Sequence, residues 1–328
     1  MQTKIAANAS AIRRWLAKSE EVLGNHSDRL NAINIFPVAD GDTGTNLYMT
    51  VRAAARAVSG SDSTDVGAVL TAASCAAMED ARGNSGTLFS VFLSAMAEPL
   101  AGATRLSGTL LAASLQRAQI RGWSALSDPQ PGTMLSVLEA AADAASAADA
   151  AQHGDDSNHA LAITLNAAVE SALDAVIATE SQLAALTSAR VVDAGGVGML
   201  LVLDCLRSVV LGENLQEALL EGLSGYAVQD PHIHAGMPAA TGVEVMCTIN
   251  LSPLEAAGLR VQLDELGESV IMTPVSALEG EAEAYRWRVH VHVADPEPAL
   301  AVIRAAGAAL NVSTTALSTA THDAPSHG

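Results

Sequence analysis

The 328-residue sequence contains few aromatic residues, which make up 3% of the chain, and this scarcity restricts the fold class. Strands are enriched in aromatic and β-branched residues, whereas alanine, which is very abundant here, is the best helix former. Hydrophobic residues still make up 49% of the chain, so a large core can be buried. A chain of this length exceeds what one core usually holds. We therefore expect two domains, of which the larger is built from closely packed helices.

Basic residues are also scarce. The chain has 17 lysines and arginines against 36 acidic residues, which gives a formal net charge of −19. Such a surface repels polyanions, so nucleic acid and anionic membranes are not expected as general partners. If the protein binds phosphate groups, metal ions and backbone amides must supply the positive field.

Cysteines and long apolar runs are few as well. The three cysteines, Cys75, Cys205 and Cys247, lie far apart and form no disulfide framework, which is typical of a reducing cytosol. The N-terminus lacks a charged-then-apolar signal segment, and no run approaches the ~20 apolar residues of a membrane span. We expect a cytoplasmic protein with no transmembrane segment.

One segment, residues 34–46, places two carboxylates in a glycine-rich turn. It reads NIFPVADGDTGTN, with Asp40 and Asp42 two residues apart. Gly41 and Gly44 permit a tight turn there. Two carboxylates that point at one spot repel each other, and Mg²⁺ prefers ligands that are all oxygen. The segment fits either a magnesium site or an ordinary surface turn, and the apolar residues on both sides favour the metal site.

A second glycine-rich segment, residues 81–86 (ARGNSG), precedes an apolar stretch that is typical of a helix. Free N–H groups and the positive end of the helix dipole make such a start suited to anions. A plain cap by Asn84 or Ser85 is the alternative. Residues 131–135 (PGTML) and 193–198 (DAGGVG) also open helices, where a core methionine and a capping Asp193 are the simpler explanations.

Together these four segments, in this order, resemble the DhaL-like nucleotide-binding domain that the dihydroxyacetone kinase L subunit shares with the bacterial fatty acid kinases. Asn34 and the Phe-Pro-Val stretch after it resemble the fatty acid kinase branch more closely, as does Thr43 where dihydroxyacetone kinases have a histidine. The resemblance implies an antiparallel eight-helix barrel over residues 1–225, with the nucleotide at one end. Helical periodicity by itself predicts helices at 5–23, 45–58, 66–79, 87–96, 106–124, 132–148, 158–180, 199–211 and 214–223.

The resemblance also implies roles for individual residues. Asn34, Asp40 and Asp42 would hold one or two Mg²⁺ ions at the phosphates of ATP or ADP. Asp40, Asp42, Thr43 and Arg82 would form the catalytic set, although Arg82 fits a salt bridge at a helix end equally well. The residues expected to bind the nucleotide are Gly44, Thr45, Asn46, Gly83, Asn84, Ser85, Gly86, Thr133, Met134, Asp193 and Gly195.

The pattern changes near residue 225. Residues 226–241 are rich in proline and glycine and lack periodicity, as in a linker. Residues 242–314 then predict a small α+β domain of order βαββαβ, with helices on one face of a sheet. Its strands are expected at 243–251, 268–273, 287–293 and 309–314, and its helices at 254–265 and 296–306. Residues 315–328 have the composition of a disordered tail.

Three side chains of this second domain suggest a zinc site. His290 and His292 alternate along a strand and therefore share one face. Cys247 lies on another predicted strand, and a thiolate with two imidazoles is a common Zn²⁺ ligand set. The resemblance supports it, because fatty acid kinases carry such a Cys and His-x-His set in their middle domain. The alternative is that the histidines lie on a sheet surface and Cys247 lies in the core.

The resemblance thus implies an ATP- and Mg²⁺-dependent kinase subunit. Its expected substrate is the carboxylate of a fatty acid presented by a separate acyl-carrying fatty-acid-binding protein, and a homodimer is a further expected partner arrangement. We expect the third, lipid-binding-like domain of such kinases to be absent, which leaves activity of this chain alone open. The alternatives are a dihydroxyacetone-kinase-like phosphotransferase with bound ADP and a non-catalytic nucleotide-binding regulatory module.

Overall fold

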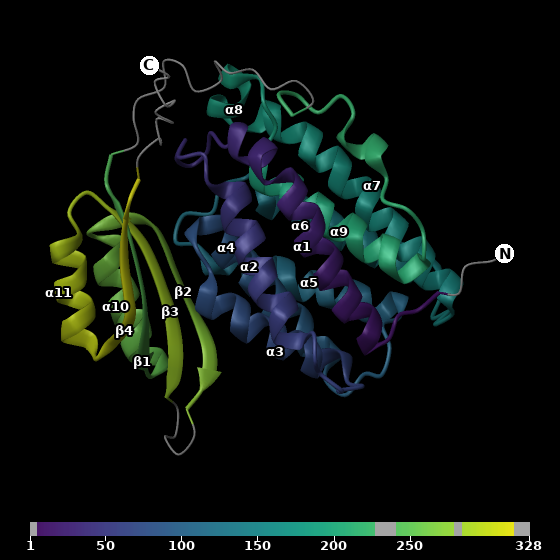
Figure 1. Ribbon diagram of the computed structural model, residues 1–328, viewed down its shortest axis with the longest axis horizontal. Helices are drawn as coiled ribbons and strands as arrows, with labels where there is room; N and C mark the ends of the chain where they lie inside the picture. Colours follow the sequence, from purple (N-terminus) through teal and green to yellow (C-terminus); the bar gives the residue numbers. More distant parts are fainter. Residues whose placement is uncertain (1–4, 227–240, 279–283, 318–328) are drawn as a thin grey trace, which may run out of the picture.

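The computed structural model describes residues 5–226, 241–278 and 284–317, which form a helical part and a smaller sheet part lying side by side (Figure 1). The long helices are α1 (Ala9–Ala32), α2 (Thr43–Val58), α3 (Val66–Asp80), α4 (Gly83–Ala97), α5 (Gly108–Ala125), α6 (Met134–Ala151), α7 (Asn158–Gln182) and α9 (Ala194–Leu211), and the short ones are α8 (Ala184–Ala189) and the 3-10 turns η1 (Glu98–Leu100) and η2 (Glu217–Leu220). Each of α1 to α7 contacts the next, α7 contacts α9, and α9 contacts α1. The predicted helical architecture is confirmed, and within the described residues its long helices close into a ring.

Polar residues at the predicted breaks start most of these helices. A side-chain oxygen accepts a hydrogen bond from the first turn in α1, α3, α5, α6, α7 and α9, from Asn8, Asp65, Ser107, Thr133, Ser157 and Asp193 respectively. Such caps satisfy N–H groups that the helix leaves free. The caps Thr133 and Asp193 begin α6 and α9 within the motifs that suggested ligand binding.

Some boundaries differ from the prediction. α1 continues to Ala32, nine residues beyond the predicted end at residue 23, and Leu30 in this extension is fully buried in the helical core. The predicted helix at 214–223 is only the turn η2, and α8 was missed. Tertiary packing overrides local propensity in α1.

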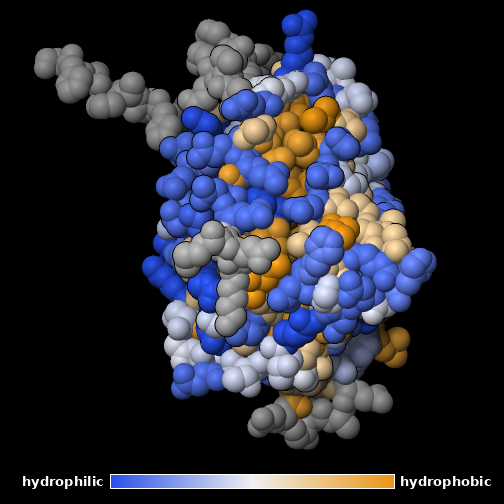
Figure 2. All heavy atoms as spheres, turned by 90° about the vertical axis from the view of Figure 1, so that its right-hand side faces the viewer, coloured by the Kyte–Doolittle hydropathy of each residue, from blue (hydrophilic) through white to orange (hydrophobic). Residues whose placement is uncertain are grey.

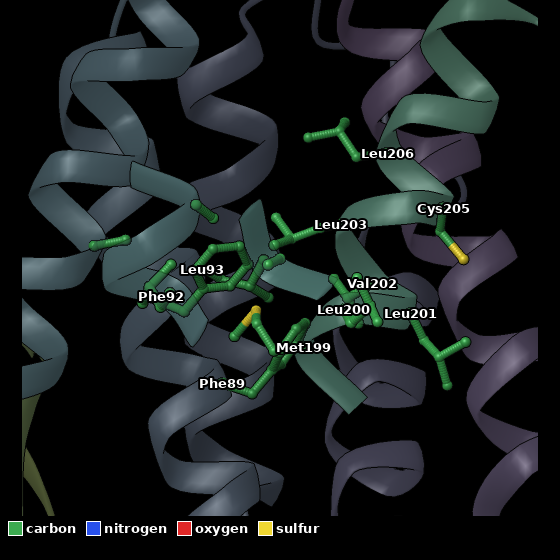
Figure 3. Close-up of a cluster of buried hydrophobic side chains, with 14 of the residues drawn as sticks. Phe89, Phe92, Leu93, Met199, Leu200, Leu201, Val202, Leu203, Cys205 and Leu206 are labelled. Carbon is green, nitrogen blue, oxygen red and sulfur yellow. The ribbon is translucent and has the colours of Figure 1, made fainter. Parts of the chain in front are cut away.

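Two helices, α4 and α9, run through the helical core and are buried along almost their whole length. Phe89 and Phe92 of α4 lie near Met199 and Leu203 of α9 in a dense apolar cluster (Figure 3). Trp15 of α1 packs edge-on against Phe92, and its indole N–H donates to the carbonyl of Val202 at 2.9 Å. Nearly every residue of both helices is buried, which explains why their sequences show little amphipathic pattern.

The expectation that no stretch approaches a membrane span needs correction. By length and composition alone, α7 and α9 are both apolar enough to cross a membrane. In α9, 94% of the most apolar window is buried inside the protein, and in α7 the share is 44%. The core position of α9 accounts for its hydropathy. On the side of the molecule shown in Figure 2, hydrophilic side chains cover most of the surface, with smaller hydrophobic areas between them.

The sheet part follows the predicted order. Its elements are β1 (Val243–Leu251), α10 (Pro253–Asp264), β2 (Gly267–Ala277), β3 (Tyr285–Val293), α11 (Pro296–Ala306) and β4 (Ala309–Ala316). The antiparallel sheet has the order β2-β3-β1-β4. α10 and α11 cover one face, as expected, and the other face is turned towards the helical part (Figure 1). The predicted linker lies almost entirely, at 227–240, outside the described residues, as does the predicted tail from 318 onward.

The two parts contact each other through apolar packing, hydrogen bonds and an ion pair. Ile271 of β2 is fully buried within the core of the helical part. The Arg288 side chain donates to the carbonyl of Ala81 at 3.1 Å, and Arg286 pairs with Glu79 at 3.4 Å. The backbone N–H of Ser127 donates to the carbonyl of Val270. The sheet therefore lies between its own helices, α10 and α11, and the helical part. The loops that carry the candidate site lie where the sheet contacts the helical part.

Candidate functional site

The Asp40–Asp42 turn lies between α1 and α2 and is tied together by Asn34. The Asn34 amide donates to Asp40 Oδ1 at 2.6 Å and to the carbonyl of Val38, and its oxygen accepts the Thr43 hydroxyl at 2.5 Å. Gly41 adopts a φ of +69°, which favours glycine. The structure therefore gives Asn34 contacts that orient Asp40 and Thr43, and its predicted role as a metal ligand stays a prediction.

Both aspartates are held where their charged forms are unfavourable. Burial, and then the negative charge of Asp42, raise the pKa of Asp40 to about 7. Burial also raises the pKa of Asp42, to which the charge of Glu244 from the sheet part contributes. A raised pKa means that the surroundings of a carboxyl group favour its neutral form over its charged form. A bound cation would relieve this cost.

The start of α4 faces this turn. Gly83 adopts a φ of +58°, and a Cβ there would lie 2.4 Å from Nδ2 of Asn46, so the position requires glycine. The Ser85 hydroxyl donates to the carbonyl of Thr43 at 3.4 Å. The Gly83 N–H donates to the Glu244 carboxylate at 3.0 Å, so a negative group already occupies one of the amides that we predicted to bind phosphate. The helix start thus does attract an anion, as its dipole predicts.

A cavity of about 660 Å³ opens beside the starts of α4, α6 and α9. Thr133, Met134, Asp193 and Gly195 line it, together with Asn84 and Ser85. The Asp193 carboxylate accepts the Gly196 N–H at 2.7 Å, and complete burial raises the pKa of this group to about 7. The predicted Thr133, Met134, Asp193 and Gly195 are thus brought to one wall of a single cavity.

A smaller cavity of about 250 Å³ contains the aspartate turn. Thr43, Asn84 and Ser85 line both cavities, so the two adjoin at the start of α4. None of the described residues that line either cavity is a lysine or an arginine, whereas the carboxylates among them are Asp40, Asp42, Asp128, Asp193, Glu244, Asp264 and Glu268. A phosphorylated ligand would meet a strongly negative site unless cations came with it.

Several predicted residues are not brought to the cavity walls. The N–H groups of Gly44 and Thr45 both donate to Asn31 Oδ1, which fixes the start of α2. Asn46 lies behind the wall, where its side chain contacts Asp42. Gly86 packs on α2, since a Cβ there would lie 2.4 Å from Thr50 Oγ1. Arg82 is exposed and lines neither cavity.

The prediction that Cys247 is a zinc ligand is wrong. Cys247 pairs with Val289 and lies in the apolar core between the sheet and its own helices. His290 and His292 alternate with Val289 and Val291, so they lie on the opposite face, towards the helical part. Side chains on opposite faces of a sheet cannot share one ion.

Sequence reasoning also missed Glu244, whose carboxylate lies 3.0 Å from His290 Nε2. A signal was present, because in β1 the residues Val245, Cys247 and Ile249 form one apolar alternation and Glu244 belongs to the other. Ser269 was missed as well. Its hydroxyl accepts from the Asn84 amide, and its carbonyl contacts His290 Nδ1. The contact between Asn84 and Ser269 cannot be read from sequence, because it depends on the docking of the two parts.

Comparison with known proteins identifies the family. The DAK2 domain matches residues 37–208, just over half of the chain, so the chain belongs to the DAK2-domain family, which supports a kinase-type nucleotide-binding role. Protein YloV of Bacillus subtilis (strain 168) is 29% identical over 260 residues, covering 76% of this chain and 46% of YloV. The uncharacterized protein SAB1090 of Staphylococcus aureus (strain bovine RF122 / ET3-1) is 28% identical over 230 residues, covering 70% of this chain and 41% of that relative. The chain thus spans less than half the length of these curated relatives.

Proposed function

We propose that this protein is an ATP- and Mg²⁺-dependent phosphotransferase of the cytoplasm. In this proposal the nucleotide lies in the larger cavity, with its phosphates at the start of α4. The observation that carries the proposal is the pair of buried carboxylates, Asp40 and Asp42, beside a helix start in a site whose described walls have no lysine or arginine. Phosphoryl transfer needs positioning and charge neutralisation above all.

The larger cavity offers suitable surroundings for a nucleoside. Phe36, Leu88, Leu126 and Met134 give it apolar walls, and polar groups lie at its junction with the smaller cavity. At that junction Asn84 Oδ1 is buried without a hydrogen-bond partner among the described residues, and a ligand donor would satisfy it. Apolar walls with a few placed polar groups are typical of small-molecule sites.

The residues of the aspartate turn fit Mg²⁺. Their oxygens are the donor type that this ion takes, and Asn34 fixes Asp40 in place. Asp40 and Asp42 would hold the ion, which when bound would supply positive charge at the phosphate oxygens. Ser85 and the N–H groups at the start of α4 would orient the phosphates, which requires Glu244 to release the Gly83 N–H.

For the phosphoryl acceptor we propose the carboxylate of a fatty acid held by a separate acyl-carrying protein. A carboxylate is already ionised at neutral pH, so it needs no general base. Apolar residues border the smaller cavity next to the aspartates, namely Pro37, Val38, Ala316 and Leu317, and they would suit an acyl group. The curated relatives are more than twice as long as the segment that this chain matches, so the contact with the acyl-carrying protein is part of the proposal.

Calorimetry tests the nucleotide half of the proposal. ATP should bind in the presence of Mg²⁺ and lose detectable affinity in EDTA, because nothing else on the described walls offsets its charge. Asp40→Asn should weaken Mg²⁺-dependent binding, whereas Asp62→Asn, on an exposed turn away from both cavities, should not. Equal affinity with and without the metal would refute the proposal.

The acceptor half needs a chemical readout. The chain is mixed with Mg²⁺, ATP and a fatty-acid-loaded binding protein, and acyl phosphate is trapped with hydroxylamine as the hydroxamate. Hydroxamate should form only when all components are present. ATP binding without any hydroxamate would retain the nucleotide site and reject the acceptor for this chain alone.

A further inference from the structure

The larger cavity has a wall that comes from the sheet part. Asp264, Gly267, Glu268 and Ser269, at the end of α10 and the start of β2, line it together with residues at the starts of α4, α6 and α9. The matched family domain covers residues 37–208 and therefore contains none of these four residues. The sheet part thus contributes contacts to this cavity that the family domain by itself does not supply.

The strand register directs Glu268 towards the helical part. Glu268 pairs with His292 of β3, and directly paired residues lie on the same face of a sheet. His292 lines the smaller cavity from the face that is turned towards the helical part, so Glu268 projects from that face too. A Cβ at Gly267 would clash with the carbonyl of His292, so β2 lies close against β3 at this point. The side chain of Glu268 is exposed, and a ligand that enters the cavity can reach it.

An irregularity in β2 brings the next residue, Ser269, to the start of α4. The pairing of β2 with β3 is irregular between Glu268 and Ile271, and the φ of Ser269 is +56°, which is rare outside glycine. The Ser269 hydroxyl accepts from the Asn84 amide at 3.3 Å. Asn84 belongs to the first turn of α4, where the proposed function places the phosphates. Glu268 is therefore one residue away from a group that contacts the phosphate end of the cavity.

The groups that line the cavity match the parts of a nucleotide in their order. Asn84 and Ser85 lie at the phosphate end, and apolar residues such as Leu126 and Met134 give walls that suit a base. In a nucleotide the ribose joins the phosphates to the base. Since Ser269 contacts the phosphate end, the ribose is the part of a bound nucleotide that comes next to Glu268.

A carboxylate on this wall suits the hydroxyl groups of a ribose. A carboxylate only accepts hydrogen bonds, whereas a hydroxyl group can donate them. In Rossmann folds an acidic side chain accepts from the ribose 2′-hydroxyl of NAD, whereas an arginine accommodates the 2′-phosphate of NADP. None of the described residues that line this cavity is a lysine or an arginine, and Asp128 and Asp264 add further negative charge. Such surroundings favour free hydroxyl groups over an additional phosphate.

We propose that Glu268 is a specificity-determining residue of the nucleotide site, and that its carboxylate accepts hydrogen bonds from the ribose hydroxyls of the bound nucleotide. This inference rests on the proposed function, because it requires the nucleotide to lie in the larger cavity. It assigns recognition of the sugar to the sheet part. The site then prefers ribonucleotides to nucleotides that lack these hydroxyls.

Calorimetry of the full chain with sugar-modified nucleotides tests the role of Glu268. With Mg²⁺ present, the parent protein should bind ATP at least ~10-fold more tightly than 2′,3′-dideoxy-ATP, as expected for the loss of hydrogen bonds to a charged group. Glu268→Ala should reduce the ratio of the two affinities to about one. The ratio is the quantity compared, because removal of a negative charge changes the affinity for both nucleotides alike. Thermal melts verify that the variant remains folded.

Glu265→Ala is the matched control. Glu265 is an exposed acidic residue three positions earlier that lines neither cavity, so this variant should keep the affinity ratio of the parent. Equal binding of both nucleotides by the parent, or a ratio that Glu268→Ala leaves unchanged, would overturn the inference and retain the Mg²⁺-dependent nucleotide site. Absence of binding by either nucleotide would reject the proposed function and this inference together.

Discussion

Asp40 is a carboxylate held where its charge is unfavourable. Its pKa in the folded protein is about 7, because of burial and then of Asp42, whereas an aspartate in an unfolded chain titrates near ~3.9. Between these values the folded state binds more protons than the unfolded state. The free energy of unfolding therefore falls as the pH rises from about 4 to about 7. Asp193, whose pKa is also about 7, adds a contribution of the same sign.

Neutralising Asp40 should stabilise the metal-free protein. We expect Asp40→Asn to raise the free energy of unfolding near pH 8 by on the order of 1–2 kcal/mol, because a buried charge and its repulsion from Asp42 are removed. The decline of stability between about pH 4 and about pH 7 should be shallower, though still present through Asp193. Urea denaturation in EDTA across this range measures both. Asp62→Asn serves as the exposed control, and an identical slope in Asp40→Asn and the parent would contradict this account.

Individual site residues were predictable where local chemistry decides their position. Asp40, Asp42, Ser85 and Asp193 lie in turns or caps whose geometry is set by neighbouring glycines and helix starts, and all line the cavities. Arg82 lines neither cavity, because neighbouring residues do not determine the direction of an exposed side chain. Gly44 and Thr45 line neither cavity, and their N–H groups donate to Asn31 on another helix.

The start of α4 depends on a backbone that only glycine supplies without strain. Gly83 combines a φ of +58° with close contact to Asn46, and its N–H holds Glu244. At Gly102 the φ is +78°, but no atom lies within 4 Å of the place that a Cβ would take. Gly102 therefore offers a matched position with the same backbone requirement and no steric contact.

We expect Gly83→Ala to destabilise the protein by more than Gly102→Ala. The left-handed conformation should cost about 1–2 kcal/mol in both variants, and only Gly83→Ala adds the clash with Asn46. Gly83→Ala should also weaken Mg²⁺-dependent ATP binding, which Gly102→Ala should leave intact. Thermal melts and calorimetry on the two variants measure these effects. Equal losses of stability would show that Asn46 moves aside without cost.

The alternation of side chains along a strand predicted which residues share a face of the sheet for β3, and it could have done so for β1. It placed His290 and His292 together, as the structure has them. The predicted zinc ligands were wrong in Cys247, whose side chain lies on the same face of β1 as the apolar Val245 and Ile249. The alternation of residues along β1 indicates this face. Helix and strand periods are local properties, which is why the order of elements in the sheet part was predictable.

The docking of the two parts was outside the reach of sequence reasoning. It depends on single residues that carry no periodic signal, such as Ile271. Arg260, Arg286 and Arg288 belong to the sheet part, and all three contact the helical part through backbone carbonyls or Glu79. In a chain with few basic residues, this concentration marks the interface only once the structure is known. Both cavities of the candidate site border this contact, so their geometry depends on it.

Ile271 should couple the stability of the two parts. It is fully buried in the helical core, while its neighbours Val270 and Met272 lie in the core of the sheet part. We expect Ile271→Ala to lower the free energy of unfolding by about 2–4 kcal/mol through the cavity that it leaves. Ile303→Ala removes the same side chain from the sheet core alone.

Native-state hydrogen exchange distinguishes the two variants. Ile271→Ala should reduce the protection of β2 and β3 and also of α3 and α4, because the lost contact joins both cores. Ile303→Ala should reduce protection mainly in the sheet and its helices. Unchanged protection of α3 and α4 in Ile271→Ala would mean that the helical part is stable without the sheet docked on it.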